Sequence, residues 1–314
     1  MRKLNIFLTF YEKWQFIWYN LNIDKKVDDL MKNRKDGKRV KNLDGMHGLI
    51  THIKPYRADS DVYINTKIDV TEMVKYVEKL KKTKEYEHLT YFHVFSTAIA
   101  KLVYNRPLLN RFVINRRYYD RNFVNLSFVA KREFTDTSEE NFSSLIVEKD
   151  DNLKTISDKI SGKVKSVRQS KLNSADDFMD KVGKLPVGLL RIICSLLKFA
   201  DNHDLIPESL TKNSIYHSSV IMTNLGSINC GSIYHNLTDF GTNSILIAIG
   251  KITEEPMVVN GKIEIRKVCD FGINLDERIA DGFYFTKSLE YFRYVLEHPE
   301  LLEENANVAI DIKK

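Results

Sequence analysis

Two short segments carry the side chains best suited to chemistry. Residues 276–282 read Asp-Glu-Arg-Ile-Ala-Asp-Gly and place the carboxylate of Glu277 between a strand-like stretch and the last helix pattern. Residues 222–228 read Met-Thr-Asn-Leu-Gly-Ser-Ile and place the hydroxyl of Thr223 at the end of another strand-like run. A carboxylate can accept a proton, and a hydroxyl can donate to a developing oxyanion. These are two of the three components that acyl transfer from coenzyme A requires. The third is a channel for the cofactor, which the sequence does not locate.

The same segments carry a resemblance to a known family. Residues 276–282 resemble the D-H-R-x-x-D-G signature of 2-oxoacid dehydrogenase acyltransferase catalytic domains, with glutamate where that family keeps its catalytic histidine. Chloramphenicol acetyltransferases carry a similar H-x-x-x-D-G motif in the same context. Residues 222–228 look like the S-N-L-G segment that supplies the family's oxyanion hydroxyl. Further similarities, which together span about residues 36–304, lie at 106–112, 245–251 and 297–302.

The resemblance implies roles for two of these residues. Thr223 stands where the family has a serine or threonine whose hydroxyl donates to the oxyanion. Asp281 stands where an aspartate fixes the active-site loop through an ion pair. Taken alone, Thr223 could also be a strand threonine bonded to backbone, and Asp281 could be a turn residue or a helix cap.

Glu277 departs from the family pattern. A carboxylate with a reference pKa of about 4.3 is mismatched by about four units to a thiol near 8.5, so it is a weaker base than histidine for that task. The adjacent Arg278 is expected to keep the carboxylate ionised. Three interpretations stay open: Glu277 is a weaker base, another histidine has taken over, or the site no longer performs chemistry.

His235 is the best histidine to substitute as the base, because it follows the Thr223 segment in a loop. A loop histidine beside a tyrosine is also typical of a hydrogen-bonded structural residue. His217 and His93 have weaker claims. His217 merely precedes a strand, and His93 lies at a helix start where no nucleophile is expected nearby.

Composition narrows the classes of function. The chain has 314 residues and a net charge of +6, from 48 basic against 42 acidic residues. This balance favours an anionic small molecule over a nucleic acid as ligand. The three cysteines are far apart and form no C-x-x-C pair, so neither a disulfide framework, a zinc site nor another metal is expected. A reducing, cytoplasmic location fits best.

Two apolar stretches need a separate explanation. In residues 1–20, Glu12 and Lys13 interrupt the apolar run, so neither an export signal nor a membrane span is predicted. Residues 185–200 form an apolar helix pattern that is also too short for a span. We expect this helix to pack on the core or on a partner subunit, with an interfacial membrane helix as the alternative.

Periodicity indicates an α/β protein. Residues 62–70 alternate as a half-buried strand does, and Asp69 with Glu72 resembles a capping box that opens the next helix. Asn260-Gly261 is a strong turn signal between two strand-like runs. Polar residues 21–45 read as an exposed connector, which gives an N-terminal extension at 1–35 and a catalytic domain at 36–314. Further strands are expected at 123–130, 143–148, 219–224 and 244–250, and further helices at 92–103, 156–167 and 288–296.

Taken with the resemblance, these patterns lead to one prediction of fold and function. The fold is a chloramphenicol acetyltransferase-like two-layer sandwich with a mixed β-sheet. The implied function is that of a stand-alone acyltransferase, which moves an acyl group between a coenzyme A thioester and an unknown small acceptor. The family forms trimers, so Glu277 of one subunit is expected to face Thr223 of the next, without lipoyl attachment or nucleic acid. The alternative is an inactive trimeric scaffold or ligand-binding protein on the same fold.

Overall fold

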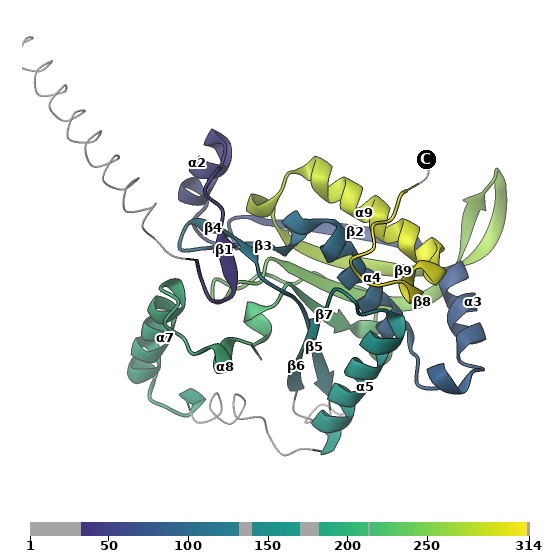
Figure 1. The fold of residues 1–314 in the computed structure, drawn as a ribbon, viewed down its shortest axis with the longest axis horizontal. Coiled ribbons are helices and arrows are strands. Elements are labelled where there is room, and N and C mark those ends of the chain that lie inside the picture. The colour runs from purple at the N-terminus through teal and green to yellow at the C-terminus, as the bar shows by residue number, and fades with distance from the viewer. Residues whose placement is uncertain (1–32, 132–139, 170–181, 213, 313–314) are drawn as a thin grey trace, which may run out of the picture. The chain divides into compact units, whose positions relative to one another are not determined.

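A six-stranded mixed sheet organises the chain (Figure 1). The structure is a computed structural model, and it describes residues 33–131, 140–169, 182–212 and 214–312. The strand order is β2-β9-β8-β7-β5-β6, in which β5, β7 and β8 run parallel and the other pairs are antiparallel. The strands are β2 (Asp61–Asp69), β5 (Val124–Lys131), β6 (Glu140–Val147), β7 (Val220–Asn224), β8 (Ile245–Val259) and β9 (Lys262–Asp276).

Four helices and one face of this sheet share the main hydrophobic core. Alternate strand residues such as Met222, Ile247 and Phe271 are buried against helix residues such as Phe95 and Phe292. The apolar faces of the helices, with a period of 3.6 residues, and of the strands, with a period of 2, therefore pack against each other at one layer boundary, as the sequence predicted. The helices are α3 (Thr71–Leu80), α4 (Tyr91–Asn105), α5 (Leu153–Gln169) and α9 (Gly282–Glu297).

A loop after β7 lies directly on the other face of the sheet. The backbone of Ile233 occupies the space that a side chain at Gly272 would fill, and a Cβ at Gly250 would come 2.7 Å from the Ser232 nitrogen. Ser232 N–H also donates to Asp270 Oδ2 at 2.7 Å. The loop can approach this closely because the strands beneath it carry glycine.

The turn predicted from the sequence is confirmed, whereas a predicted helix cap is wrong. Asn260 and Gly261 both have positive φ, 50° and 76°, and they join β8 to β9. Helix α3 has Val70 at its N-cap without a side-chain cap bond, and Asp69 instead accepts a hydrogen bond from Thr71 N. The capping box lies on α4, between Thr90 and His93.

A second, three-stranded sheet was not expected. Its order is β1-β4-β3, and β1 falls inside the stretch that the sequence presented as an exposed connector. Phe112 and Tyr119 stack in its small core at 5.4 Å between ring centroids. These short strands escape prediction because three to five residues are too few to show a period. The strands are β1 (Gly37–Arg39), β3 (Arg111–Ile114) and β4 (Arg117–Arg121).

Helix α7 (Val187–Asn202) carries a largely exposed apolar surface. Its residues Val187, Ile192 and Phe199 are 66%, 58% and 56% exposed, so the core covers only its inner side in part. One predicted alternative was that this helix packs on the core. In the structure, the apolar side chains on the outer face of α7 are not covered by the core. Within the described ranges, no helix is long and apolar enough to cross a membrane.

The remaining elements are short. From Lys35 onward, the described residues form one compact unit. Predictions for residues 1–20 lie outside the described residues, and the domain bounds 1–35 and 36–314 stay predictions. The other helices are α2 (Gly45–Ile53) and α8 (Glu208–Thr211). The 3-10 helices are η1 (Lys84–Tyr86), η2 (Pro107–Asn110), η3 (Ile215–His217), η4 (Leu225–Ile228), η5 (Glu277–Ile279) and η6 (Pro299–Glu303).

Candidate active site

The loop that carries Glu277 is fixed by a buried ion pair. Strand β9 ends at Asp276, whose carboxylate is fully buried and accepts from Arg278 Nε at 2.8 Å and from Nη2 at 2.7 Å. Burial opposes the charge of the guanidinium, but the Asp276 carboxylate offsets this, and the pKa of Arg278 is raised. The guanidinium fork of Arg278 is therefore engaged by Asp276. That Arg278 also keeps Glu277 ionised stays a prediction.

The partner of Glu277 is Lys54, a residue that sequence reasoning did not single out. Lys54 directly follows α2, and its Nζ contacts Glu277 Oε1 with both side chains 36% exposed. Arg278 Nη1 donates to the Lys54 carbonyl at 2.9 Å, and Glu277 N–H donates to the Ser60 carbonyl at 2.9 Å. The two segments are more than 200 residues apart in the sequence, so no local signal could have joined them.

Thr223 lies on the sheet face opposite the four helices. Its neighbour Met222 is buried in the core, so strand alternation directs the half-buried Thr223 side chain to the other face. Among the hydrogen bonds of the described residues, none uses the Thr223 hydroxyl, so the backbone-bonded alternative is not what the structure shows. This hydroxyl is free to donate to a ligand.

Thr223 and Glu277 are far apart within one chain. Thr223 pairs with Ala248 on β8, which pairs with Gly272 on β9, and Glu277 follows Gly272 by five residues. Two strand spacings across and five residues along the strand give a separation of roughly 19 Å between their Cα atoms. One copy of the chain cannot bring both side chains to the same reacting atom.

A cavity of about 990 Å³ opens beside the Thr223 segment. Asn224, Gly226 and Ser227 line it together with Lys251, so two of the segments that carried the resemblance meet at one cavity. A Cβ at Gly226 would come 2.8 Å from the Gly250 carbonyl oxygen, which explains glycine at that position. The apolar residues in its other walls are Phe92, Phe95, Phe128, Val129, Ile160, Val164, Ile249 and Ile252. Polar wall residues are His88, Thr90, Tyr91, His93, Ser161, Asn229 and a second basic residue, Lys165.

His93 also lines this cavity, and it has a hydroxyl partner. Its Nδ1 lies 2.8 Å from Ser157 Oγ and accepts a longer bond of 3.4 Å from Thr90 N–H. The expectation of no nucleophile near His93 is therefore wrong. Burial lowers the pKa of His93 to about 4, so the imidazole is neutral at physiological pH. Nδ1 accepts from a backbone N–H, which places the ring proton on Nε2.

His235 is held beside Asn274 on β9. Its backbone N–H donates to Asn274 Oδ1 at 3.0 Å, and Asn274 follows Gly272 by two residues on β9. Within the described residues, its buried Nε2 has no hydrogen-bond partner. Two strand spacings and two residues place Asn274 about 12 Å from Thr223 between Cα atoms. The structure therefore gives His235 a fixed position on the sheet face, without direct contact with Thr223.

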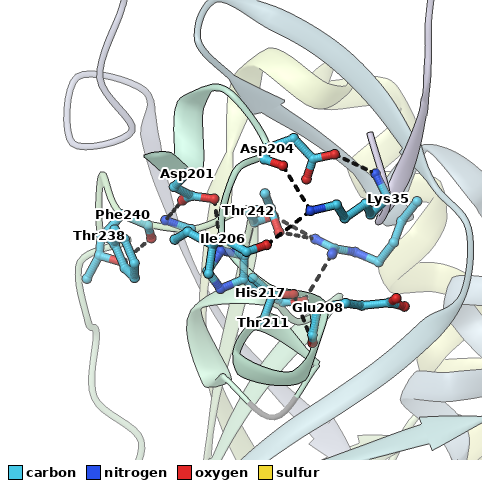
Figure 2. A network of polar contacts seen from close by, with 12 residues as sticks. Lys35, Asp201, Asp204, Ile206, Glu208, Thr211, His217, Thr238, Phe240 and Thr242 are labelled. Carbon is cyan, nitrogen blue, oxygen red and sulfur yellow. Dashed lines mark hydrogen bonds and ion pairs between the residues drawn. The ribbon is translucent and has the colours of Figure 1, made fainter. Parts of the chain in front are cut away.

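His217 belongs to a buried polar network (Figure 2). Its Nε2 lies 3.1 Å from Asp201 Oδ1, and both side chains are 3% exposed. The other Asp201 oxygen accepts from the backbone N–H of Gly241 at 3.0 Å. This network joins α7 to the loop before β8, so the weaker claim given to His217 agrees with a structural role.

Asp281 caps helix α9. Its carboxylate accepts from Tyr284 N–H at 2.7 Å, the bond expected of an N-cap residue. In the part of the chain that the structure describes, Asp281 forms no ion pair, whereas Asp276 pairs with Arg278 in the same loop. The ion pair that the resemblance implied for Asp281 is therefore made by a neighbouring carboxylate.

Comparison with solved structures defines the class of fold. The chain is similar to a probable dihydrolipoamide acetyltransferase from Listeria monocytogenes, with a TM-score of 0.56 and 16% identity over 83% of this chain and 95% of that one. It is also similar to a chloramphenicol acetyltransferase, with a TM-score of 0.50 and 9% identity over 83% and 98% of the two chains. The fold is that of the chloramphenicol acetyltransferase-like proteins, and the predicted fold class is confirmed.

Sequence comparison shows which family the chain is similar to. Residues 200–303 match the family model of the 2-oxoacid dehydrogenases acyltransferase (catalytic domain). The chain is 23% identical over 235 residues to the lipoamide acyltransferase component of the branched-chain alpha-keto acid dehydrogenase complex from Bacillus subtilis, which covers 73% of this chain and 45% of that protein. The chain spans less than half the length of the curated relatives it matches. The resemblance recognised in the sequence motifs is confirmed.

Proposed function

We propose that this protein is an acyltransferase whose active site forms between two copies of the chain. The observation that carries the proposal is the placement of the two half-sites on one sheet. Glu277 lies near the start of β8, where Asp276 N–H donates to the Ser244 carbonyl at 3.0 Å, whereas Thr223 lies near the end of β7. Within one chain, Glu277 and Thr223 are too far apart to act on the same substrate. A second copy of the chain supplies the missing half-site.

A contact between two different surfaces of identical chains closes into a ring when the rotation allows it. The half-sites of Glu277 and Thr223 are such surfaces, and the family resemblance favours a ring of three. In this assembly each of three interfaces holds one Glu277 and one Thr223. The exposed apolar side of α7 supports self-association, since large apolar patches mark interaction surfaces.

The donor is a coenzyme A thioester, and the cavity lined by Asn224, Gly226 and Ser227, which follow Thr223 in the chain, accommodates its arm. The apolar walls suit the alkyl part of such an arm, while Lys165 and Lys251 suit its phosphate groups. The Thr223 hydroxyl then donates to the oxyanion of the tetrahedral intermediate. The proposed reaction uses neither a lipoyl group on this chain nor a metal, and both substrates are small molecules in the cytoplasm.

A non-catalytic scaffold is the second candidate, and one observation favours it. Lys54 neutralises Glu277, so the carboxylate that stands in for the family's histidine is already engaged. In this alternative the ion pair stabilises an interface or a ligand, and Thr223 is a relic of the ancestral site.

Complementation between variants tests the shared site directly. Thr223→Val and Glu277→Gln each impair one half, so each variant alone should release thiol from acyl-coenzyme A much more slowly than the parent. After the subunits are mixed and exchanged, roughly one interface in four pairs two intact halves, and activity should return. Light scattering should report three times 36.6 kDa. A monomer, or variants that fail to complement while the parent is active, would contradict the shared site; an inactive parent that binds thioester would favour the scaffold.

A further inference from the structure

We propose that the acyl acceptor is a primary amine, bound as its ammonium ion by Glu277 in the place that the Lys54 side chain now occupies. This inference rests on the proposed function and adds the class of acceptor. It starts from the contact of Lys54 Nζ with Glu277 Oε1, which shows that this carboxylate receives an alkylammonium group.

Glu277 and Lys54 both lie on backbone that Arg278 holds, but the lysine side chain is the longer and more flexible of the two. Asp276 and Arg278 are at most 2% exposed and fix the loop, and Arg278 also holds the backbone carbonyls of Lys54 and Pro55 at 2.9 and 3.3 Å. The Lys54 side chain is a four-carbon stem that is 36% exposed, and its ammonium has no other partner among the described residues. Lys54 can therefore swing away, whereas Glu277 stays in place.

The position suits an acceptor that arrives as a cation. Glu277 is exposed enough to be reached from solvent, and a carboxylate binds an ammonium through a short charge-assisted hydrogen bond. A neutral thiol or alcohol gains no such contact. Ile53 and Tyr56, 62% and 53% exposed on either side of Lys54-Pro55, offer apolar surface to the alkyl part of an amine.

Glutamate in place of histidine suits an amine as nucleophile. A thiol or hydroxyl acceptor needs a base to remove its proton before or during attack, and a typical carboxylate is a poor match for that proton. An amine attacks through its own lone pair once its ammonium has lost one proton to solvent. After the attack the nitrogen is again positively charged and is far more acidic than a thiol or an alcohol, so a weak base is sufficient to remove the second proton.

The atoms and charges balance across the interface. The amine nitrogen attacks the thioester carbonyl carbon, and the carbonyl electron pair moves to oxygen, where the partner copy's Thr223 hydroxyl donates to it. Glu277 takes the proton from the positively charged nitrogen. The oxyanion collapses, the carbon–sulfur bond breaks, and the leaving thiolate receives the proton from Glu277. The products are an amide and free coenzyme A.

A matched series of four-carbon acceptors tests the inference on the full-length protein. With acetyl-coenzyme A as donor, n-butylamine, which reproduces the lysine side chain, is compared with n-butanol and n-butanethiol. Amide, ester and thioester products are quantified by mass spectrometry, since a thiol acceptor interferes with thiol detection. We expect transfer to the amine at least about tenfold faster than to either neutral acceptor, as one lost charge-assisted contact implies.

Two variants separate the role of Lys54 from that of Glu277. Lys54→Met removes the internal ammonium but keeps the stem, so the KM for butylamine should fall severalfold. Glu277→Gln should raise that KM at least about tenfold. Lys67→Met is the matched control, because Lys67 forms an exposed ion pair with Glu255 on another part of the sheet.

The outcomes distinguish this inference from the proposed function. Transfer to butanethiol or butanol but not to butylamine would overturn the amine inference and leave the acyltransferase proposal standing. An unchanged KM for butylamine in both variants would also overturn it. If no acceptor is acylated although calorimetry shows that acetyl-coenzyme A binds, both proposals fail in favour of the scaffold.

Discussion

The two halves of the candidate site differ in how they are built. The Glu277 half consists of charges, with one buried ion pair between Asp276 and Arg278 and one half-exposed pair to Lys54. The Thr223 half consists of a hydroxyl without a hydrogen-bond partner among the described residues, followed in the chain by three residues that line a mostly apolar cavity together with Lys165 and Lys251. The family pattern is kept in the second half and altered in the first.

In the proposed function, this difference shows where the chain departs from the family pattern. Groups that would handle the thioester and its oxyanion stay in the family arrangement around Thr223. In that proposal the group that handles the acceptor is replaced, and three charged residues, Lys54, Asp276 and Arg278, lie around it. A change confined to one half points to a new acceptor more directly than to a new donor.

The largest expected effect comes from breaking the frame of the charged half. Arg278→Met leaves Asp276 as a buried charge without its partner, which should cost about 3–5 kcal/mol of unfolding free energy. Arg266→Met is the matched control, because Arg266 pairs with Asp69 at 18% and 19% exposure and should cost about 1 kcal/mol. Urea denaturation measures both. Equal losses of unfolding free energy in the two variants would show that the buried Asp276–Arg278 pair contributes no more than the more exposed Arg266–Asp69 pair.

The next effect concerns the other half. Thr223→Val should lower the turnover about a hundredfold or more, a loss of about 2.7 kcal/mol, with little change in thioester affinity, because the hydroxyl acts mainly in the transition state. Thr253→Val, on the neighbouring strand β8, is the control and should keep its activity. Parallel losses of folding and activity in Thr223→Val would assign the threonine a structural role instead.

The third effect concerns His93 in the cavity wall and is confined to acidic pH. His93 is neutral when folded because burial lowers its pKa from 6.5 to about 4, so the unfolded chain binds the extra proton. Its contribution to stability is complete above about pH 6.5 and declines as the pH falls towards 4, by at most about 3 kcal/mol. His93→Gln should therefore lose less stability than the parent between these pH values in urea titrations. The exposed His88→Gln serves as control, and parallel curves for all three proteins would refute the assignment.

Sequence reasoning found what local patterns encode. The hairpin at Asn260-Gly261 and the amphipathic helices were predicted because their signals lie within a few neighbouring residues. The segment around Thr223 was also found, since its strand and its motif are contiguous. Periodicity predicted the strands and helices, and the family resemblance predicted how they pack as a two-layer sandwich.

What the sequence could not provide depends on contacts between distant segments. Lys54 and Glu277 meet only because Arg278 ties two loops together, and charge alone did not show that Arg278 would choose Asp276 over its other neighbour. Ser157 reaches His93 from a different helix. Each of these pairs is fixed by tertiary packing, which no spacing along the chain reports.

The glycines beneath the loop after β7 have a further consequence. At Gly272 the obstacle to a side chain is the main chain of Ile233 itself, which cannot rotate out of the way as a side chain would. A single added methyl group would therefore displace a whole segment and carry His235 with it. The loop can lie on this face only because Gly250 and Gly272 have no side chains, so substitutions at these two positions should be poorly tolerated.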